Sequence, residues 1–184
     1  MKSFLMPKGG TPLYLSTAAV IAALYVVFTL PFAQFAYGPL QFRLSEIFVV
    51  LPLFTSSAIP GLSAGCLIAN LFNPNSLGVI DVFFGTLATF LAACFTRIIS
   101  GGERRERSLK RGAAALVPPV LFNALIVGSY LPFLLTEGPV TFPLVLVSMS
   151  QLACSEAVLV YALGFPFFLF IRKSNLEKTI FRNV

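Results

Sequence analysis

The sequence contains no histidine, few charged residues and only three cysteines, and each shortage excludes a class of site. Without histidine, most metal sites and the Ser-His or Cys-His nucleophile pairs of hydrolases are excluded. Cys66, Cys94 and Cys154 are odd in number and lie inside apolar runs, so we expect small buried hydrophobes rather than disulfides or metal ligands. No Gly-Lys pair occurs, which excludes an ATP-binding loop of the G-x-x-x-x-G-K-[ST] type. The sequence therefore predicts no enzyme, no metal site and no cofactor.

The composition departs from that of a soluble domain in both apolar and charged residues. Of 184 residues, 57% are hydrophobic and 11% are charged, whereas a soluble domain has roughly 45–50% and about 25%. This composition predicts an integral membrane protein. The excess of 13 Lys and Arg over 7 Asp and Glu would suggest a nucleic acid partner in a soluble chain. Here membrane topology explains the excess more simply, and no nucleic acid is expected.

Hydropathy predicts an all-α bundle of six transmembrane helices in a single domain that covers residues 1–184. A helix needs about 20 apolar residues to cross the hydrocarbon of a bilayer. The predicted spans are about 13–32, 46–57, 60–71, 80–99, 113–135 and 142–171. The second and third spans are short, and we separate them at Pro60 because proline breaks a continuous helix.

The basic residues predict how this bundle is oriented. Six spans place both termini and the loop 101–112 on one side, and that side holds twelve of the thirteen basic residues, Arg43 being the exception. Because positive charge accumulates on the cytoplasmic side, both termini are expected in the cytoplasm. We therefore expect a multi-pass protein of the bacterial plasma membrane, surrounded by lipid.

The segment GPLQFRLSE, residues 38–46, carries the only formal charges between residues 9 and 80, Arg43 and Glu46. Two interpretations are open. The two residues form a local ion pair at the start of a helix, or they line a polar vestibule for a solute. The predicted topology places Asn70 and Asp81 on the same outer side of the membrane, which favours a shared polar site there.

Two of the predicted spans carry polar residues deeper in the membrane. At 1.5 Å of rise per residue, Asn123 lies near the middle of the fifth span. On the sixth span, Ser148, Gln151 and Ser155 share one helical face, with Glu156 beside it. A carboxylate at that depth needs a partner inside the protein. Glu156 either makes a hydrogen bond between helices, for example to Asn123, or contacts a solute.

The first span repeats small residues four positions apart, as Ala18 with Ala22 and Ala19 with Ala23. This spacing flattens one face of a helix, so that another helix can approach closely. The approaching helix belongs either to this bundle or to a partner protein.

Five segments, taken in order, carry a likeness to a known family: QFRLSE, PGLSAGCLIANLF, DVFFGTLATFLAA, PPVLFNALIVG and SEAVLVYALGFP. From about residue 17 to residue 167 the chain resembles the QueT family, the substrate-binding S components of energy-coupling factor (ECF) transporters. The resemblance implies capture of queuosine precursors, which are deazaguanine-type bases, from the outer side. It also implies a transmembrane coupling subunit driven by two ATPases, with Ala18, Ala19, Ala22 and Ala23 facing that subunit.

A guanine-like base presents two adjacent donors that a carboxylate accepts in parallel, and a carbonyl edge that suits an amide side chain. The residues that we predict to bind the substrate are Arg43, Glu46, Asn70, Asp81, Asn123, Gln151 and Glu156. Phe42, Tyr130 and Tyr161 are candidates to stack on the base. A stand-alone secondary carrier for a small polar solute remains the alternative function, because it too would place acidic groups near the middle of the membrane.

Overall fold

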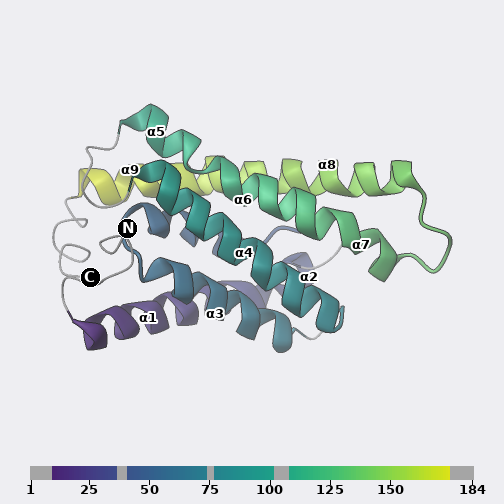
Figure 1. The fold of residues 1–184 in the computed structure, drawn as a ribbon, viewed down its shortest axis with the longest axis horizontal. Coiled ribbons are helices and arrows are strands. Elements are labelled where there is room, and N and C mark those ends of the chain that lie inside the picture. The colour runs from purple at the N-terminus through teal and green to yellow at the C-terminus, as the bar shows by residue number, and fades with distance from the viewer. Residues whose placement is uncertain (1–9, 37–40, 74–76, 102–107, 175–184) are drawn as a thin grey trace.

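The computed structural model describes residues 10–36, 41–73, 77–101 and 108–174, and this part of the chain is all-helical, without a strand (Figure 1). The elements are α1 (Thr11–Thr29), η2 (Leu30–Phe32), α2 (Ala33–Ala36), η3 (Leu44–Leu53), α3 (Ala58–Leu71), α4 (Val79–Ser100), α5 (Leu109–Ala114), α6 (Val117–Phe122), η5 (Asn123–Val127), α7 (Gly128–Leu135), α8 (Phe142–Val158), η6 (Leu159–Gly164) and α9 (Phe165–Lys173). The predicted all-α class is confirmed for these residues.

Four continuous helical stretches are long and apolar enough to cross a membrane: Thr11–Phe32, Val79–Ser100, Leu109–Leu135 and Phe142–Lys173. They match the predicted first, fourth, fifth and sixth spans. The shorter apolar helices η3 and α3 take the places of the second and third. Large apolar side chains point outward from the long stretches, such as Val27, Phe83 and Phe133, each about 60% exposed. Such a surface is suited to lipid.

The break between the two short helices lies at residues 54–57, whereas we predicted it at residues 58–59, just before Pro60. Pro60 is instead the third residue of α3. In the first turn of a helix the backbone N–H has no partner within the helix, so a proline there removes no hydrogen bond. The polar residues Thr55, Ser56 and Ser57 form the connection, and the Thr55 and Ser57 hydroxyl groups are hydrogen-bonded to each other at 2.8 Å.

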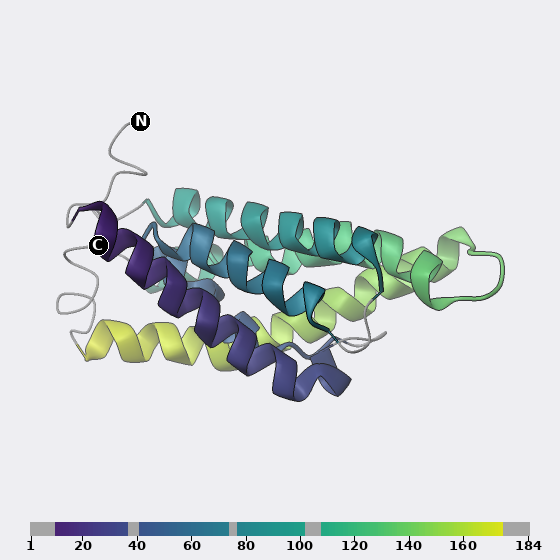
Figure 2. The same cartoon turned by 90° about the horizontal axis from the view of Figure 1, so that it is seen from below.

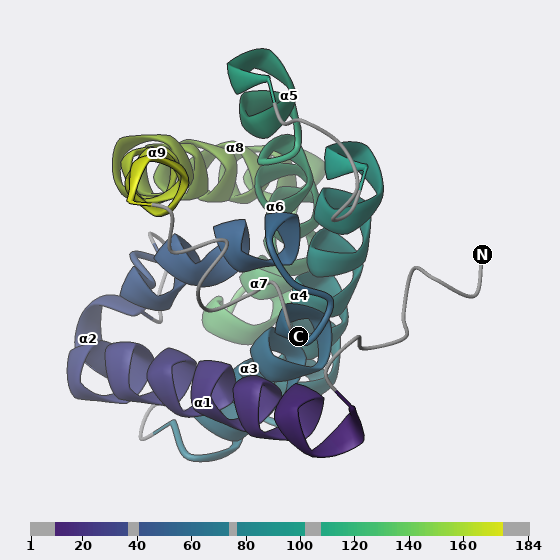
Figure 3. The same cartoon turned by 90° about the vertical axis from the view of Figure 1, so that its left-hand side faces the viewer.

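The short helix η3 lies inside the bundle, in contact with α1, α4 and the η6–α9 segment (Figure 3). Nearly all of its side chains are buried, including Phe48, Val50 and Leu53. The core of the protein is formed around η3 and α3. Any polar residue on η3 is therefore held away from lipid.

Helix α1 packs closely along α3 (Figure 2). Gly61 and Gly65 of α3 face α1, where Ala18 and Ala22 are buried at 8% exposure each. The four alanines predicted to face a partner protein therefore fall into two pairs with different surroundings. Ala18 and Ala22 are occupied by packing within the bundle, and the exposed alanines are Ala19 and Ala23.

We predict that Gly65→Ala destabilises the protein. A methyl group on Gly65 would lie 2.6 Å from Cβ of Tyr25 and 3.0 Å from the backbone oxygen of Ala22. Overpacking of this kind costs about 1–3 kcal/mol, so the melting temperature of the purified protein in detergent should fall. The matched control is Gly138→Ala, because nothing lies within 4 Å of the added methyl group there. Equal melting temperatures for the two variants would contradict the packing described here.

Candidate functional site

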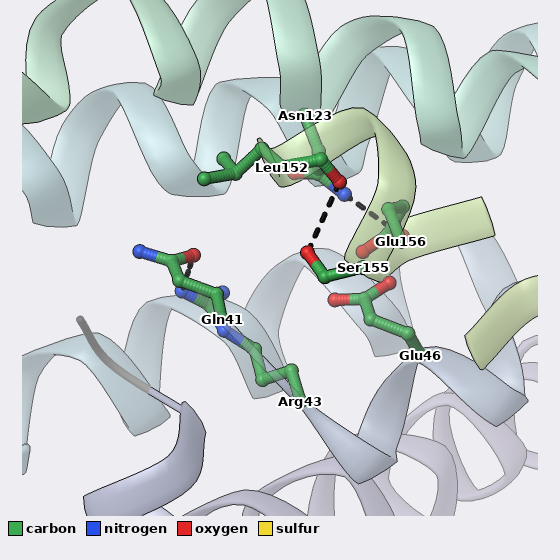
Figure 4. Close-up of a pocket in the computed structure, with 7 residues that line it drawn as sticks. All are labelled: Gln41, Arg43, Glu46, Asn123, Leu152, Ser155 and Glu156. Atoms are coloured by element: carbon green, nitrogen blue, oxygen red, sulfur yellow. Dashed lines mark hydrogen bonds between the residues drawn. The ribbon is translucent and has the colours of Figure 1, made fainter. Parts of the chain in front are cut away.

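A small polar cavity lies where η3, η5 and α8 meet (Figure 4). Its lining residues are Gln41, Arg43, Glu46, Asn123, Leu152, Ser155 and Glu156. Six of these seven side chains are polar, although the helices around them are strongly apolar. The cavity volume is about 10 Å³, which is room for about one water molecule. Six polar residues of the bundle thus gather at one internal point.

The two carboxyl groups of the cavity are each held by one donor from another helix. The hydroxyl group of Tyr25, on α1, donates to Oε1 of Glu46 at 2.9 Å. The amide Nδ2 of Asn123, on η5, donates to Oε1 of Glu156 at 3.1 Å. Glu46 is 2% exposed and Glu156 is 6% exposed. Both hydrogen bonds leave the second carboxyl oxygen, Oε2, for other interactions.

The two carboxyl groups also lie close enough to interact with each other, and their oxygens approach across the cavity (Figure 4). Glu46 occupies the first turn of η3, where the unpaired N–H groups at the start of a helix favour a negative charge. Glu156 lies on the buried side of α8, together with Ser148, Leu152 and Ser155. The fold therefore brings together two acidic residues that are 110 positions apart in the sequence.

Arg43 begins a second chain of hydrogen bonds. Its guanidinium donates from Nη2 to Oε1 of Gln41 at 3.4 Å and from Nη1 to Sγ of Cys66 at 3.7 Å. The same sulfur accepts from Nδ2 of Asn70 at 3.6 Å and from the hydroxyl group of Thr89 at 3.3 Å. Cys66 was expected to be a small buried hydrophobe; it is buried, but it also acts as an acceptor that joins three polar residues.

The second chain continues from Asn70 to Asp81. Nδ2 of Asn70 lies 3.4 Å from the backbone oxygen of Asp81, and the Asp81 carboxylate accepts from the hydroxyl group of Tyr130 at 2.7 Å. Asp81 is 1% exposed. These residues do not line the cavity themselves. They are connected to the cavity residue Arg43 by hydrogen bonds through the sulfur of Cys66.

The helices around the cavity are irregular. The ten residues of η3 form a 3-10 helix, although such helices are usually only three or four residues long. The π-helical segment η5 starts at Asn123, and another, η6, starts three residues after Glu156. Wider turns of this kind occur often at functional sites. Here the wider turns lie next to Asn123 and Glu156, whose side chains form a hydrogen bond between the fifth and sixth predicted spans.

The predicted substrate-binding residues fall into three groups. Arg43, Glu46, Asn123 and Glu156 line the cavity. Asn70 and Asp81 belong to the hydrogen-bonded chain behind it. Gln151 is not at the cavity. It lines a separate groove on α8, together with Leu146, Val147, Ser150 and Cys154.

Sequence reasoning left several residues of this region out of the predicted site. Gln41 and Ser155 line the cavity, and their positions beside Arg43 and Glu156 in the sequence were a usable signal. The roles of Tyr25 and Cys66 were missed, because a single phenol or thiol inside an apolar run gives no such signal. None of the predicted stacking rings lines the cavity. Phe42 is 40% exposed, Tyr130 is bonded to Asp81, and the hydroxyl group of Tyr161 donates to the backbone of Ala113.

The chain is similar to known proteins of one family. The sequence model described as "QueT transporter" matches residues 15–173. A relative named "Queuosine precursor transporter QueT", from Lactococcus lactis subsp. cremoris strain MG1363, is 36% identical over 77 residues. That alignment spans 41% of this chain and 44% of the relative, which is less than half of either protein. No solved structure gives a significant match.

The family match covers most of the chain, including every element that lines the cavity. A family of transporters, rather than of enzymes, accounts for a polar cavity enclosed by lipid-facing helices. This chain belongs to the QueT transporter family.

Proposed function

We propose that this protein is the substrate-capture (S) component of an ECF-type ABC importer in the bacterial plasma membrane. Its substrate is a queuosine precursor, a deazaguanine-type base, taken from the outer side. Family membership supports transport, and the name of the Lactococcus relative supports the substrate. The observation that carries the proposal is the cavity itself, where six polar side chains meet inside an apolar bundle.

The proposed topology is a single domain that crosses the membrane six times, with both termini in the cytoplasm. Four helices are long enough to cross alone. The ten residues of η3 and the 14 residues of α3 each extend about 20 Å at about 2.0 and 1.5 Å of rise per residue. Each is shorter than a hydrocarbon core of about 30 Å. Because other helices enclose η3, its polar start lies within the bundle rather than in lipid.

The cavity residues match the edge of a guanine-like base. A carboxylate of Glu156 or Glu46 can accept the adjacent ring N–H and amine donors of such a base, with the added strength of a charged acceptor. Gln41 is 7% exposed, and its Nε2 has no hydrogen-bond partner in the described part of the structure. A buried donor without an acceptor is costly, and the carbonyl oxygen of a base would satisfy it.

The cavity must widen before a base can enter. Its volume of about 10 Å³ holds about one water molecule, so a ring system requires η3, η5 and α8 to separate around it. The irregular turns of η3, η5 and η6 lie at the elements that would move. We therefore propose that the described structure is a closed state and that capture proceeds from a more open one.

The energy for uptake would come from a partner module. The sequence has no phosphate-binding loop of its own, which is consistent with a separate coupling subunit and two ATPases. The test is to purify the protein from membranes that contain these subunits and to ask whether they co-isolate. Co-isolation is expected. Uptake that persists in cells without the module would favour the stand-alone secondary carrier.

We predict that Glu156→Gln lowers the affinity for a deazaguanine base by about tenfold or more, equivalent to ~1.4 kcal/mol. The amide replaces a charged acceptor with a neutral group that accepts at one atom only. Isothermal titration calorimetry on the purified protein measures the change. Glu137→Gln is the matched control, because Glu137 is exposed between α7 and α8. Unchanged binding by the Glu156 variant would remove this residue from the site.

We predict that Ala19→Leu together with Ala23→Leu reduces co-isolation of the coupling subunit severalfold. Both alanines are exposed on α1, and larger side chains would hold a partner helix away from this face. Base affinity should stay unchanged, because neither residue lines the cavity. Ala162→Leu, an exposed alanine on η6, is the control. Normal co-isolation of the double variant would place the partner on another surface.

A further inference from the structure

The contact between Glu46 and Glu156 requires a proton. A side-chain hydrogen bond joins the two carboxyl groups across the cavity, and their oxygens face each other in Figure 4. A carboxylate has no hydrogen to donate, so two ionised carboxyl groups would repel each other here instead of bonding. Both side chains are more than nine-tenths buried, so bulk water does not screen such a repulsion. The bond between the two acids therefore holds one proton.

One shared proton also balances the charges of the cavity. Arg43 is the only basic side chain among the described lining residues, and its guanidinium attracts both carboxyl groups. With a single proton between them, the two acids carry one negative charge, which offsets that of Arg43. A second proton would leave Arg43 uncompensated, and the loss of the first would leave one carboxylate in excess. Uncompensated charge is costly inside a membrane protein, so one proton is favoured.

The elements packed around the pair contribute few other groups that titrate or carry charge. The segments η5 and α6 have none. The others are Tyr25 of α1, Cys66 of α3, Asp81 of α4, Tyr130 of α7, Tyr161 of η6, and, at the other end of η3 or in the last turn of α9, Arg97, Arg172 and Lys173. Of these, Tyr25 acts directly on the pair, because its hydroxyl group donates to Glu46. The proton is therefore held by the two carboxyl groups themselves.

The shared proton connects η3 to α8, and the proposed entry of a base separates these two elements. Separation pulls the two carboxyl groups apart and lets water reach them. A glutamate side chain in water is ionised at neutral pH. Glu46 also lies in the first turn of η3, where the unpaired N–H groups favour a negative charge. The open form therefore holds fewer protons than the closed form.

A second observation at the same cavity points to a ligand. The Gln41 side chain lines the cavity and is 7% exposed, and its Nε2 has no acceptor within the described structure. Its Oε1 accepts from Arg43 at 3.4 Å, and the two nearby carboxyl groups are bonded to each other. An unsatisfied buried donor is costly. A ligand that separates the two acids and offers a carbonyl oxygen to Gln41 removes this cost.

We propose that capture of the base releases the proton shared by Glu46 and Glu156. The O–H bond of the protonated acid breaks, its electron pair stays on the carboxyl oxygen, and the proton passes to the surrounding water. One of the two carboxylates then accepts the donors of the base, and the other faces Arg43. This inference rests on the proposed function, because it assigns a proton to the same capture step.

Calorimetry on the full-length protein tests the release with deazaguanine that carries no charged substituent. The heat of binding should differ between phosphate and Tris, whose ionisation enthalpies differ, by the amount expected for about one proton released per base. Because the bound form holds fewer protons, a rise in pH favours binding. The affinity should therefore increase about tenfold per pH unit near neutral pH. Glu46→Gln should abolish both effects, because a single acid opposite Arg43 has no proton to share.

Infrared spectroscopy tests the shared proton without a ligand. A protonated carboxyl group has a C=O stretching band that a carboxylate lacks. The purified protein, in a detergent without ester groups, should show this band at neutral pH. Glu46→Gln and Glu156→Gln should each remove it, because the acid that remains is ionised opposite Arg43. Glu137→Gln is the matched control, since Glu137 is exposed, and it should retain the band.

The outcomes separate this inference from the proposed function. If the base does not bind, the proposed substrate is overturned, and proton release on its capture is overturned as well. If the base binds with the same heat in both buffers and with an affinity independent of pH, only the proton release is overturned. A band that survives in both glutamine variants and disappears in Asp81→Asn would assign the proton to Asp81 and contradict the shared pair. The heats of the unmodified protein decide even if a variant fails to fold.

Discussion

A carboxyl group inside a lipid-facing bundle has little water to bind, so it needs partners from the protein, and in this fold that need brings distant helices together. Glu46 is bonded to Tyr25 of α1, and Glu156 to Asn123 of η5. Because the two acids line one cavity, these contacts connect the first, second, fifth and sixth predicted spans at one point. The apolar packing of η3 and α3 holds that point away from lipid.

Much of the fold could be predicted from the sequence, because lipid imposes a simple length rule on helices. Four helical stretches long enough to cross a membrane lie near the positions of four predicted spans, and four of the seven predicted binding residues line the cavity. The rotation of a helix about its axis was harder to predict. In a soluble helix the polar face marks the solvent side, whereas both faces of a membrane helix are apolar. Gln151 was therefore assigned to the face of Ser155, but it lies at a separate groove.

The alternatives left open by the sequence are answered in different ways. For Glu156, the hydrogen bond to Asn123 is present, and the same carboxyl group also lines the cavity. On α1, Ala18 and Ala22 pack against α3 within the bundle. Their spacing in the sequence is the same as that of Ala19 and Ala23, so spacing alone could not show which pair packs internally. The break before α3 was misplaced because proline is tolerated in a first helical turn. Each of these results depends on which residues pack against the position in the folded protein. A single sequence does not contain that information.

We propose that the polar residues of the cavity form a binding site for a deazaguanine-type base. Native mass spectrometry tests this most directly, with protein purified gently from cells that were supplied with the base. We expect one base bound to each unmodified protein and none bound when Glu46 and Glu156 are both replaced by glutamine. Unmodified protein that carries no base, or a double variant that retains it equally well, would show that the cavity does not bind this base.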